Sequence, residues 1–232
     1  MSGADVAAAL AAEGFALGAV VAGLTAADLD RPSPCPPWTA AELTCHVIIG
    51  AGRIAAALRE PEDPAGPLIT ALGYYRPDER FSAAVDADRI DTARNLAQRL
   101  GSAEAVSAEL TRACTESVAL LTSARADRTV RTRHGDRMLL TDFACTRVVE
   151  LGLHGLDLAV ALDRPPWLTG AAAAVLEELL LPAGNALGLR AELGCDQPTL
   201  IGLLTGRAVP APAAAAVLAS AGATSLALGP SR

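Results

Sequence analysis

The sequence contains no lysine: all nineteen of its basic residues are arginine. A lysine-free chain excludes every mechanism that needs a lysine amine, which covers Schiff-base chemistry with pyridoxal phosphate, the phosphate-binding P-loop and lysine general bases. The formal net charge of −7 argues against a nucleic-acid surface, because the neutralisation of phosphates requires a basic patch. The exclusive use of arginine, with abundant alanine, glycine and proline, is typical of a GC-rich genome.

Aromatic residues are also scarce, at 3% of the 232 residues, although 51% of the chain is hydrophobic. The chain can bury a sizeable core, and that core must consist mainly of small and branched aliphatic side chains. Such cores suit helices better than sheets, so we expect a mostly α protein. The five cysteines are scattered and form no CxxC pair, which predicts neither a disulfide framework nor a structural zinc knuckle.

The apolar N-terminus lacks the features of a signal peptide or a membrane helix. No basic region precedes it, it contains Asp5 and Glu13, and its longest uncharged run begins at Gly14 and ends before Asp28. That run is too short to span a bilayer. We therefore expect a buried bundle helix, a cytoplasmic location and no membrane partner.

Apolar periodicity and turn residues predict the order of the helices. The clearest start follows the four prolines between Arg31 and Trp38, where Thr39 and Glu42 form a capping box. Alternation around His134 predicts a short hairpin, followed by a helix that Thr141 or Asp142 caps. We expect helices over residues 4–24, 39–59, 82–100, 102–124, 141–162, 170–187, 198–204 and 213–221, with a bundle over residues 1–165 and a smaller, mainly helical region over 166–232.

The helix predicted over residues 141–162 carries an unexpected polar stripe. Arg147, Glu150, His154 and Asp157 are spaced three, four and three residues apart, so they lie on one helical face. The other faces are apolar, which is typical of a buried helix, and burying an unpaired charge costs several kcal/mol. The stripe therefore needs partners or water.

Glu150 and His154 are suitably spaced to bind one metal ion, if a facing helix supplies a third ligand. His46, on the border of the apolar face of the second predicted helix, is a candidate for that ligand. Two histidines and a carboxylate would leave coordination positions open, as in catalytic metal sites. Arg147 and Asp157 could then orient the ligands or a substrate anion. The same spacing is also found in surface salt bridges, and a single histidine such as His46 is often a hydrogen-bonded core residue.

Two segments, CPPWTAAELTCHV and MLLTDFACTRVVELGLHGLDLAVAL, resemble the mycothiol-dependent maleylpyruvate isomerase family, a branch of the DinB-like metal-binding four-helix bundles. The family pattern is a tryptophan before a capped helix with the first histidine, and a later helix with an Arg-Val-x-Glu-x-x-x-His-Gly-x-Asp-Leu core. The resemblance covers about residues 1–165. The matching residues are Trp38, His46, Arg147, Val148, Glu150, His154, Gly155, Asp157 and Leu158.

The resemblance implies a DinB-like four-helix bundle in which His46, Glu150 and His154 hold a divalent metal, usually zinc. It also implies mycothiol as a small-thiol cosubstrate. A metal-held thiolate can add to an electron-poor double bond, allow rotation and leave again, which is isomerisation, or it can stay attached, which is S-transfer. A metal-dependent hydrolase, a metal-free cyclase or isomerase, and a non-catalytic ligand-binding bundle remain alternatives.

The C-terminal region departs from the family pattern. In the maleylpyruvate isomerases an α/β C-terminal domain contributes an arginine to the site, whereas this tail is short, alanine-rich and helical in pattern. Arg207, in LLTGRAV, resembles a Leu-x-Gly-Arg element of some relatives, so Arg207 and Trp38 are candidates for contacts with substrate or thiol. Cys45 points away from His46 on an ideal helix and is expected in the core. Exposed apolar helix faces are compatible with a homodimer.

Overall fold

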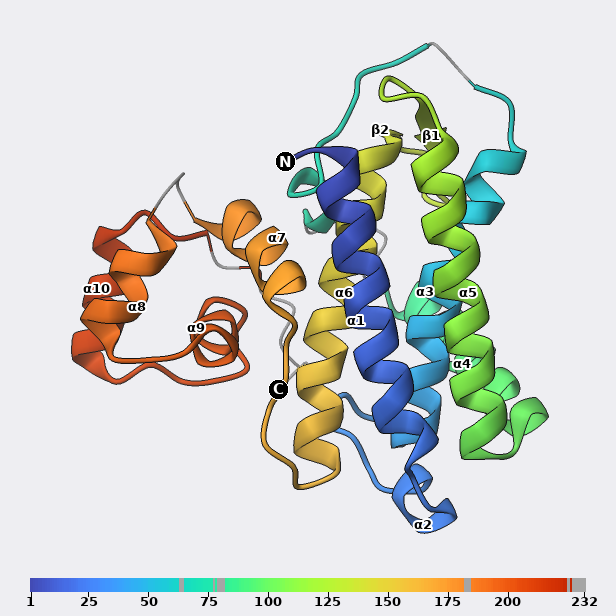
Figure 1. Ribbon diagram of the computed structural model, residues 1–232, viewed down its shortest axis with the longest axis horizontal. Helices are drawn as coiled ribbons and strands as arrows, with labels where there is room; N and C mark the ends of the chain where they lie inside the picture. The colour runs from blue at the N-terminus through green and yellow to red at the C-terminus, as the bar shows by residue number, and fades with distance from the viewer. Residues whose placement is uncertain (63–64, 77, 79–81, 182–184, 225, 227–232) are drawn as a thin grey trace.

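The computed structural model describes residues 1–62, 65–76, 78, 82–181, 185–224 and 226. Within these residues the chain is mostly helical, which confirms the predicted fold class (Figure 1). The elements are α1 (Gly3–Ala22), α2 (Ala26–Leu29), α3 (Ala40–Arg59), the 3₁₀ helix η1 (Gly73–Tyr75), α4 (Ala83–Leu100), α5 (Ala103–Ser123), β1 (Thr129–Arg131), β2 (Arg137–Leu139), α6 (Leu140–Ala161), α7 (Gly170–Leu180), α8 (Ala186–Leu193), α9 (Gln197–Leu204) and α10 (Pro212–Ser220).

The four long helices α1, α3, α5 and α6 form the bundle. Helix α1 packs against α5 and α6, and α3 packs against the same two helices, so α1 and α3 lie diagonally across the bundle. Helix α4 covers the side of α3, and the β1–β2 hairpin lies at the end of the bundle where α6 begins (Figure 1). Because α3 and α6 are neighbours, residues from both helices can share one site.

Side chains at the helix starts explain most of the observed boundaries. Thr39 accepts a hydrogen bond from the Glu42 amide while the Glu42 carboxylate accepts one from the Thr39 amide, which confirms the predicted capping box of α3. Another capping box, between Thr25 and Asp28, forms the short helix α2, which we did not predict. Gly101 ends α4 with φ of 68°, a left-handed conformation that favours glycine.

The predicted cap of α6 was wrong. The antiparallel strands pair Thr129 with Leu139, and β2 continues directly into the helix, whose N-cap is Leu139. The first helical amide, that of Leu140, donates to the Arg128 carbonyl at 2.8 Å, so the hairpin supplies an acceptor that a capping side chain would otherwise provide. Asp142 instead accepts a hydrogen bond from the Ala71 amide at 3.2 Å and holds the preceding loop.

Small side chains allow the bundle helices to approach closely. A Cβ on Gly14 of α1 would lie 2.7 Å from the Cys114 sulfur of α5, so that position has room only for glycine. Cys45 is fully buried, as expected of a core residue, and burial raises the pKa of its thiol to about 12. A core of small residues therefore compensates for the scarcity of aromatic side chains.

Helix α7 connects the C-terminal region to the bundle by packing against α1 and α6, while α8, α9 and α10 lie beyond it (Figure 1). The buried Glu13 of α1 accepts hydrogen bonds from the amide and hydroxyl of Thr169, the N-cap of α7. The single helix predicted over residues 170–187 was wrong, because α7 ends at Leu180 and Leu181 is extended. Pro182 follows in the sequence, and a proline disfavours helical geometry in the residue before it.

By length and hydropathy, α1 and α3 could cross a membrane, but at least half of each segment is buried inside the bundle. Core helices of soluble proteins pass the same test. Their apolar faces are therefore accounted for by the packing described above.

Candidate metal centre

Three of the predicted site residues come together between α3 and α6. His46 projects from α3, and Glu150 and His154 lie one turn apart on α6. The His46 Nε2 and His154 Nε2 atoms lie 3.5 and 3.4 Å from the same Glu150 oxygen, Oε2. One ligand atom from each residue lies within 4.8 Å of the other two. Helical spacing on α6 and the packing of α3 against α6 thus bring two nitrogens and one oxygen close together.

The chemistry of these donors fits a divalent ion such as zinc. Zinc bonds to histidine nitrogen and carboxylate oxygen are about 2.0–2.2 Å long, so neighbouring ligands of a tetrahedral ion are about 3.4 Å apart. The two nitrogen–oxygen separations agree with that value. Three protein ligands leave a fourth position for water or substrate, as in catalytic sites.

The three groups have strongly perturbed pKa values. Burial lowers the pKa of His46 to about 4, so this imidazole is neutral over the physiological range. Burial also opposes the charge on His154, but hydrogen bonds with Asp157, Cys35 and Glu150 outweigh it and hold the His154 pKa well above its usual range. The same balance holds for Glu150, where the two histidines outweigh burial and keep the pKa well below normal. Glu150 is therefore ionised and His46 is neutral, whereas a metal ion would have to displace the proton of His154.

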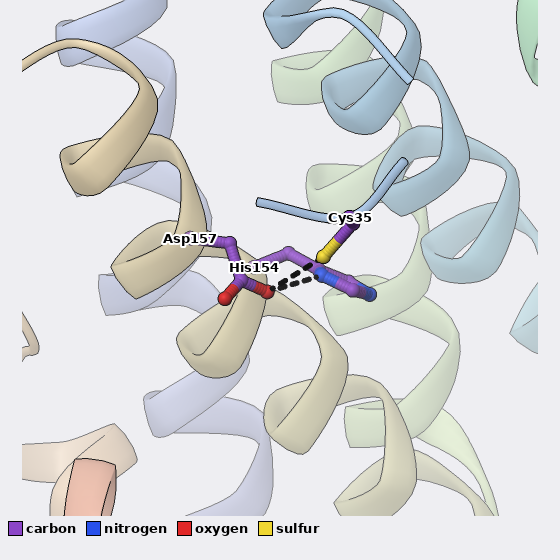
Figure 2. Close-up of side chains that lie close together, drawn as sticks. All are labelled: Cys35, His154 and Asp157. Carbon is purple, nitrogen blue, oxygen red and sulfur yellow. Dashed lines mark hydrogen bonds and ion pairs between the residues drawn. The ribbon is translucent and has the colours of Figure 1, made fainter. Parts of the chain in front are cut away.

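Asp157 fixes the orientation of His154. Its Oδ2 lies 2.9 Å from His154 Nδ1, so it can accept a hydrogen bond from that nitrogen and leave Nε2 facing Glu150. Figure 2 shows the same carboxylate facing the thiol of Cys35, whose sulfur lies 3.4 Å from Oδ2. Burial raises the pKa of Asp157, but His154 and Arg207 outweigh it and lower the value. Asp157 is therefore an ionised, buried acceptor beside His154. Its role in orienting a metal ligand stays a prediction.

Arg207 reaches this carboxylate from the C-terminal region. Its Nε donates to Asp157 Oδ1 at 2.9 Å and its Nη2 donates to Oδ2 at 2.8 Å, which is a bidentate pair. The remaining Nη1 is buried and has no hydrogen-bond partner among the described residues. We predicted contact with substrate or thiol for Arg207. The observed contact is with Asp157, and Nη1 remains available for a further acceptor.

Trp38 and Tyr75 restrict the other two candidate ligands. The Trp38 ring stacks on His46, with centroids 4.6 Å apart and planes inclined by 24°, and it is itself mostly buried. The Tyr75 hydroxyl lies 3.1 Å from the Thr146 carbonyl oxygen and 3.4 Å from Glu150 Oε1, while Glu150 Oε2 faces the histidines. The observed contact of Trp38, which we predicted to touch substrate or thiol, is therefore with a candidate ligand.

Arg147 lies on the predicted face of α6 but points away from the candidate ligands. Its Nε and Nη2 donate to the Thr146 hydroxyl at 3.0 and 2.9 Å. Its guanidinium carbon lies 5.5 and 5.1 Å from the ring centroids of Tyr74 and Phe143. Burial opposes its charge, but Tyr74 and Glu150 raise its pKa above the normal value. Its role in orienting a ligand or an anion stays a prediction.

Cys35 and Tyr75 belong to the site, although the sequence pattern did not identify them. Cys35 lies in the proline-rich loop three residues before Trp38, and Tyr75 lies between the helices that we predicted over residues 39–59 and 82–100. Proximity to Trp38 was the one available signal for Cys35. Tyr75 had none, because η1 folds against α6 through contacts about seventy residues apart in the chain.

Comparison with known protein families shows to which family the chain belongs. Residues 10–159, more than half of the chain, match the family model described as the mycothiol maleylpyruvate isomerase N-terminal domain. The chain belongs to this family. No curated protein and no solved structure matches it. The family match contains all three candidate ligands and ends before the C-terminal region that carries Arg207.

Proposed function

We propose that this family member is a cytoplasmic, metal-dependent and mycothiol-dependent enzyme. His46, Glu150 and His154 would hold a divalent ion, with zinc as the best fit to two imidazoles and one carboxylate. The reaction would be thiol addition to a small electrophilic metabolite, with isomerisation or S-transfer as the outcome. We further propose that residues 1–165 form the metal-binding bundle and that residues 166–232 form a separate C-terminal region.

The observation that carries this proposal is the approach of two histidine nitrogens to one oxygen of Glu150. A surface salt bridge would bring one imidazole to a carboxylate. Here two imidazoles from different helices share one oxygen, at separations suited to a common ion. The family match adds the link to mycothiol, which comes from the name of the family.

A bound divalent ion would lower the pKa of a thiol or water, so that the nucleophile forms at neutral pH. The chain's own residues prepare the site for it. Trp38 and Asp157 hold the two imidazole rings, and Tyr75 engages one Glu150 oxygen while the other faces the histidines. The Nη1 group of Arg207, buried next to Asp157, could donate to an oxygen of the thiol or the electrophile.

Elemental analysis of the purified protein tests the metal site. We expect about one zinc or similar ion per chain in the wild type, and loss of that ion in the single variants His46→Ala and His154→Ala. The third histidine of the chain supplies a matched control, because His134 lies in the hairpin turn and His134→Ala should keep the metal. Equal metal content in all four proteins, each folded by circular dichroism, would refute the proposal.

Kinetics with the metal-loaded protein test the reaction class. We expect consumption of an electron-poor alkene such as a maleyl compound only when a thiol is present, with free thiol regenerated in isomerisation and consumed in S-transfer. Turnover without any thiol would instead favour the metal-dependent hydrolase, or, if it persists after the metal is removed, the metal-free cyclase or isomerase. Metal binding without turnover of any tested electrophile would favour a binding protein.

A further inference from the structure

A cavity lined by several arginines lies at the hairpin end of the bundle. It has a volume of about 450 Å³ and lies between α3, α6, η1 and the β1–β2 hairpin. This volume is within the usual range for small-molecule sites. Its walls include three arginines, Arg53, Arg131 and Arg133, and two aromatic rings, Tyr74 and Phe143.

The cavity is separate from the candidate metal centre. Arg53 lies seven residues after His46 on α3, and Phe143 lies seven residues before Glu150 on α6. These two helices run in opposite directions (Figure 1), so Arg53 and Phe143 both lie two turns closer to the hairpin than the candidate ligands. Two turns of helix correspond to about 10 Å along the bundle. Arg147 lies between Phe143 and Glu150 on α6, and its guanidinium contacts the Phe143 ring. The cavity lining includes none of the three candidate ligands.

Arg53 lacks a counterion in this cavity. It is partly buried and makes no hydrogen bond or ion pair with any residue in the described part of the chain. Burial, followed by the nearby charges of Arg133 and Arg147, lowers its pKa to about 10. A partly buried guanidinium that has no ion-pair partner among the described residues is suited to bind an anion.

Arg133 adds a second cation with little local compensation. Its Nη1 lies 3.7 Å from Asp88, whose side chain is mostly exposed, and its pKa is lowered by burial and by Arg89. The acidic residue that lines the cavity is Glu60, which is exposed at the end of α3. The charges facing the cavity are therefore mainly positive in a chain with a net charge of −7.

We propose that this cavity binds a small organic anion, whose carboxylate or phosphate group pairs with Arg53 and Arg133. Guanidinium groups bind both kinds of anion through paired N–H donors. The rest of the ligand would be apolar or aromatic, because Tyr74, Phe143 and Pro61 supply the remaining wall. Glu60 repels anions at the rim and limits the affinity.

Calorimetric titration of the full chain tests this binding site with three probes that share a phenyl ring. Benzoate and phenyl phosphate carry the two candidate anionic groups, and benzamide is the uncharged counterpart of benzoate. We expect one or both anions to bind, benzamide to bind at least about tenfold more weakly, and the tighter anion to identify the preferred group. The titrations are repeated with His46→Ala, where anion binding should persist, so that failure of the metal proposal leaves this test unaffected.

Arg53→Gln and Arg133→Gln should each weaken anion binding by about tenfold or more. The matched control is Arg59→Gln, on the same helix but outside the cavity and paired with Glu116, and it should leave the affinity unchanged. Glu60→Gln should strengthen binding, a gain that misfolding cannot produce. No anion binding by the wild type, equal binding of benzamide, or affinities unchanged in the Arg53, Arg133 and Glu60 variants would each overturn the proposal.

Discussion

Asp157→Asn should uncouple the C-terminal region from the candidate metal centre. Asp157 is 2% exposed, and its two oxygens face His154 Nδ1 and two N–H groups of Arg207. Asparagine replaces one oxygen with an amide that can only donate, so in either orientation a donor faces a donor. The substitution also leaves the buried Arg207 without its opposite charge.

The expected magnitudes follow from these contacts. Removing one partner of a buried ion pair costs about 3–5 kcal/mol, and the remaining carbonyl oxygen of asparagine places the effect at the lower end of that range. Loss of a histidine-orienting carboxylate lowers metal affinity about 10–100-fold. Urea unfolding measures the first quantity, and competition with a chromophoric zinc chelator measures the second.

The matched control is Asp163→Asn, the same change at an exposed position just after α6, where φ is 55° and asparagine is equally tolerated. Asp157→Asn combined with Arg207→Gln should cost less stability than the sum of the two single changes, because neither charge is then left unpaired. Additive costs, or a metal affinity for Asp157→Asn equal to that of the control, would refute this account of the site.

Two further predictions concern pH. The pKa of His154 is held well above normal, so a metal ion must displace its proton in order to bind. Zinc affinity should therefore rise about tenfold per pH unit between about pH 5.5 and 7.5. A zinc affinity that does not change with pH in chelator competition would contradict this. Burial raises the pKa of Glu13 despite hydrogen bonds from Thr169, so its contribution to stability is largest when it is protonated and falls as pH rises through its folded-state pKa. Glu13→Gln keeps an acceptor for Thr169 without the charge. Its free energy of unfolding in urea should therefore increase relative to that of the wild type between acidic and neutral pH. An equal difference at both pH values would show that the charge is not the cause.

Local signals predicted the helices and part of the site. Thr39 and Glu42 are three residues apart, so their capping box could be recognised from the sequence and was found in the structure. Glu150 and His154 share a helical face for the same reason, and their atoms do approach each other. His46 was a candidate because it borders the apolar face of its own helix, and the family pattern then supported it, but no spacing within one helix relates it to α6.

Predictions failed or stayed incomplete where the partner is distant in the chain. The cap of α6 was predicted wrongly because its first amide donates to the Arg128 carbonyl, across the hairpin, instead of to a nearby side chain. Arg147 shares the polar face of α6, yet its long side chain packs against Tyr74 and Phe143. The division into two regions at residue 165 and the homodimer remain predictions.

The sequence by itself determined the helical class, the main helix starts and the pairing of Glu150 with His154, because these depend on residues within four positions of each other. Only the tertiary structure decided that Asp157 meets Cys35 and Arg207, which are 122 and 50 positions away along the chain. It also brought Arg53 and Arg133 to one cavity. Helical geometry alone sets the first kind of contact, whereas the second requires that loops and neighbouring helices pack together, which depends on the whole core.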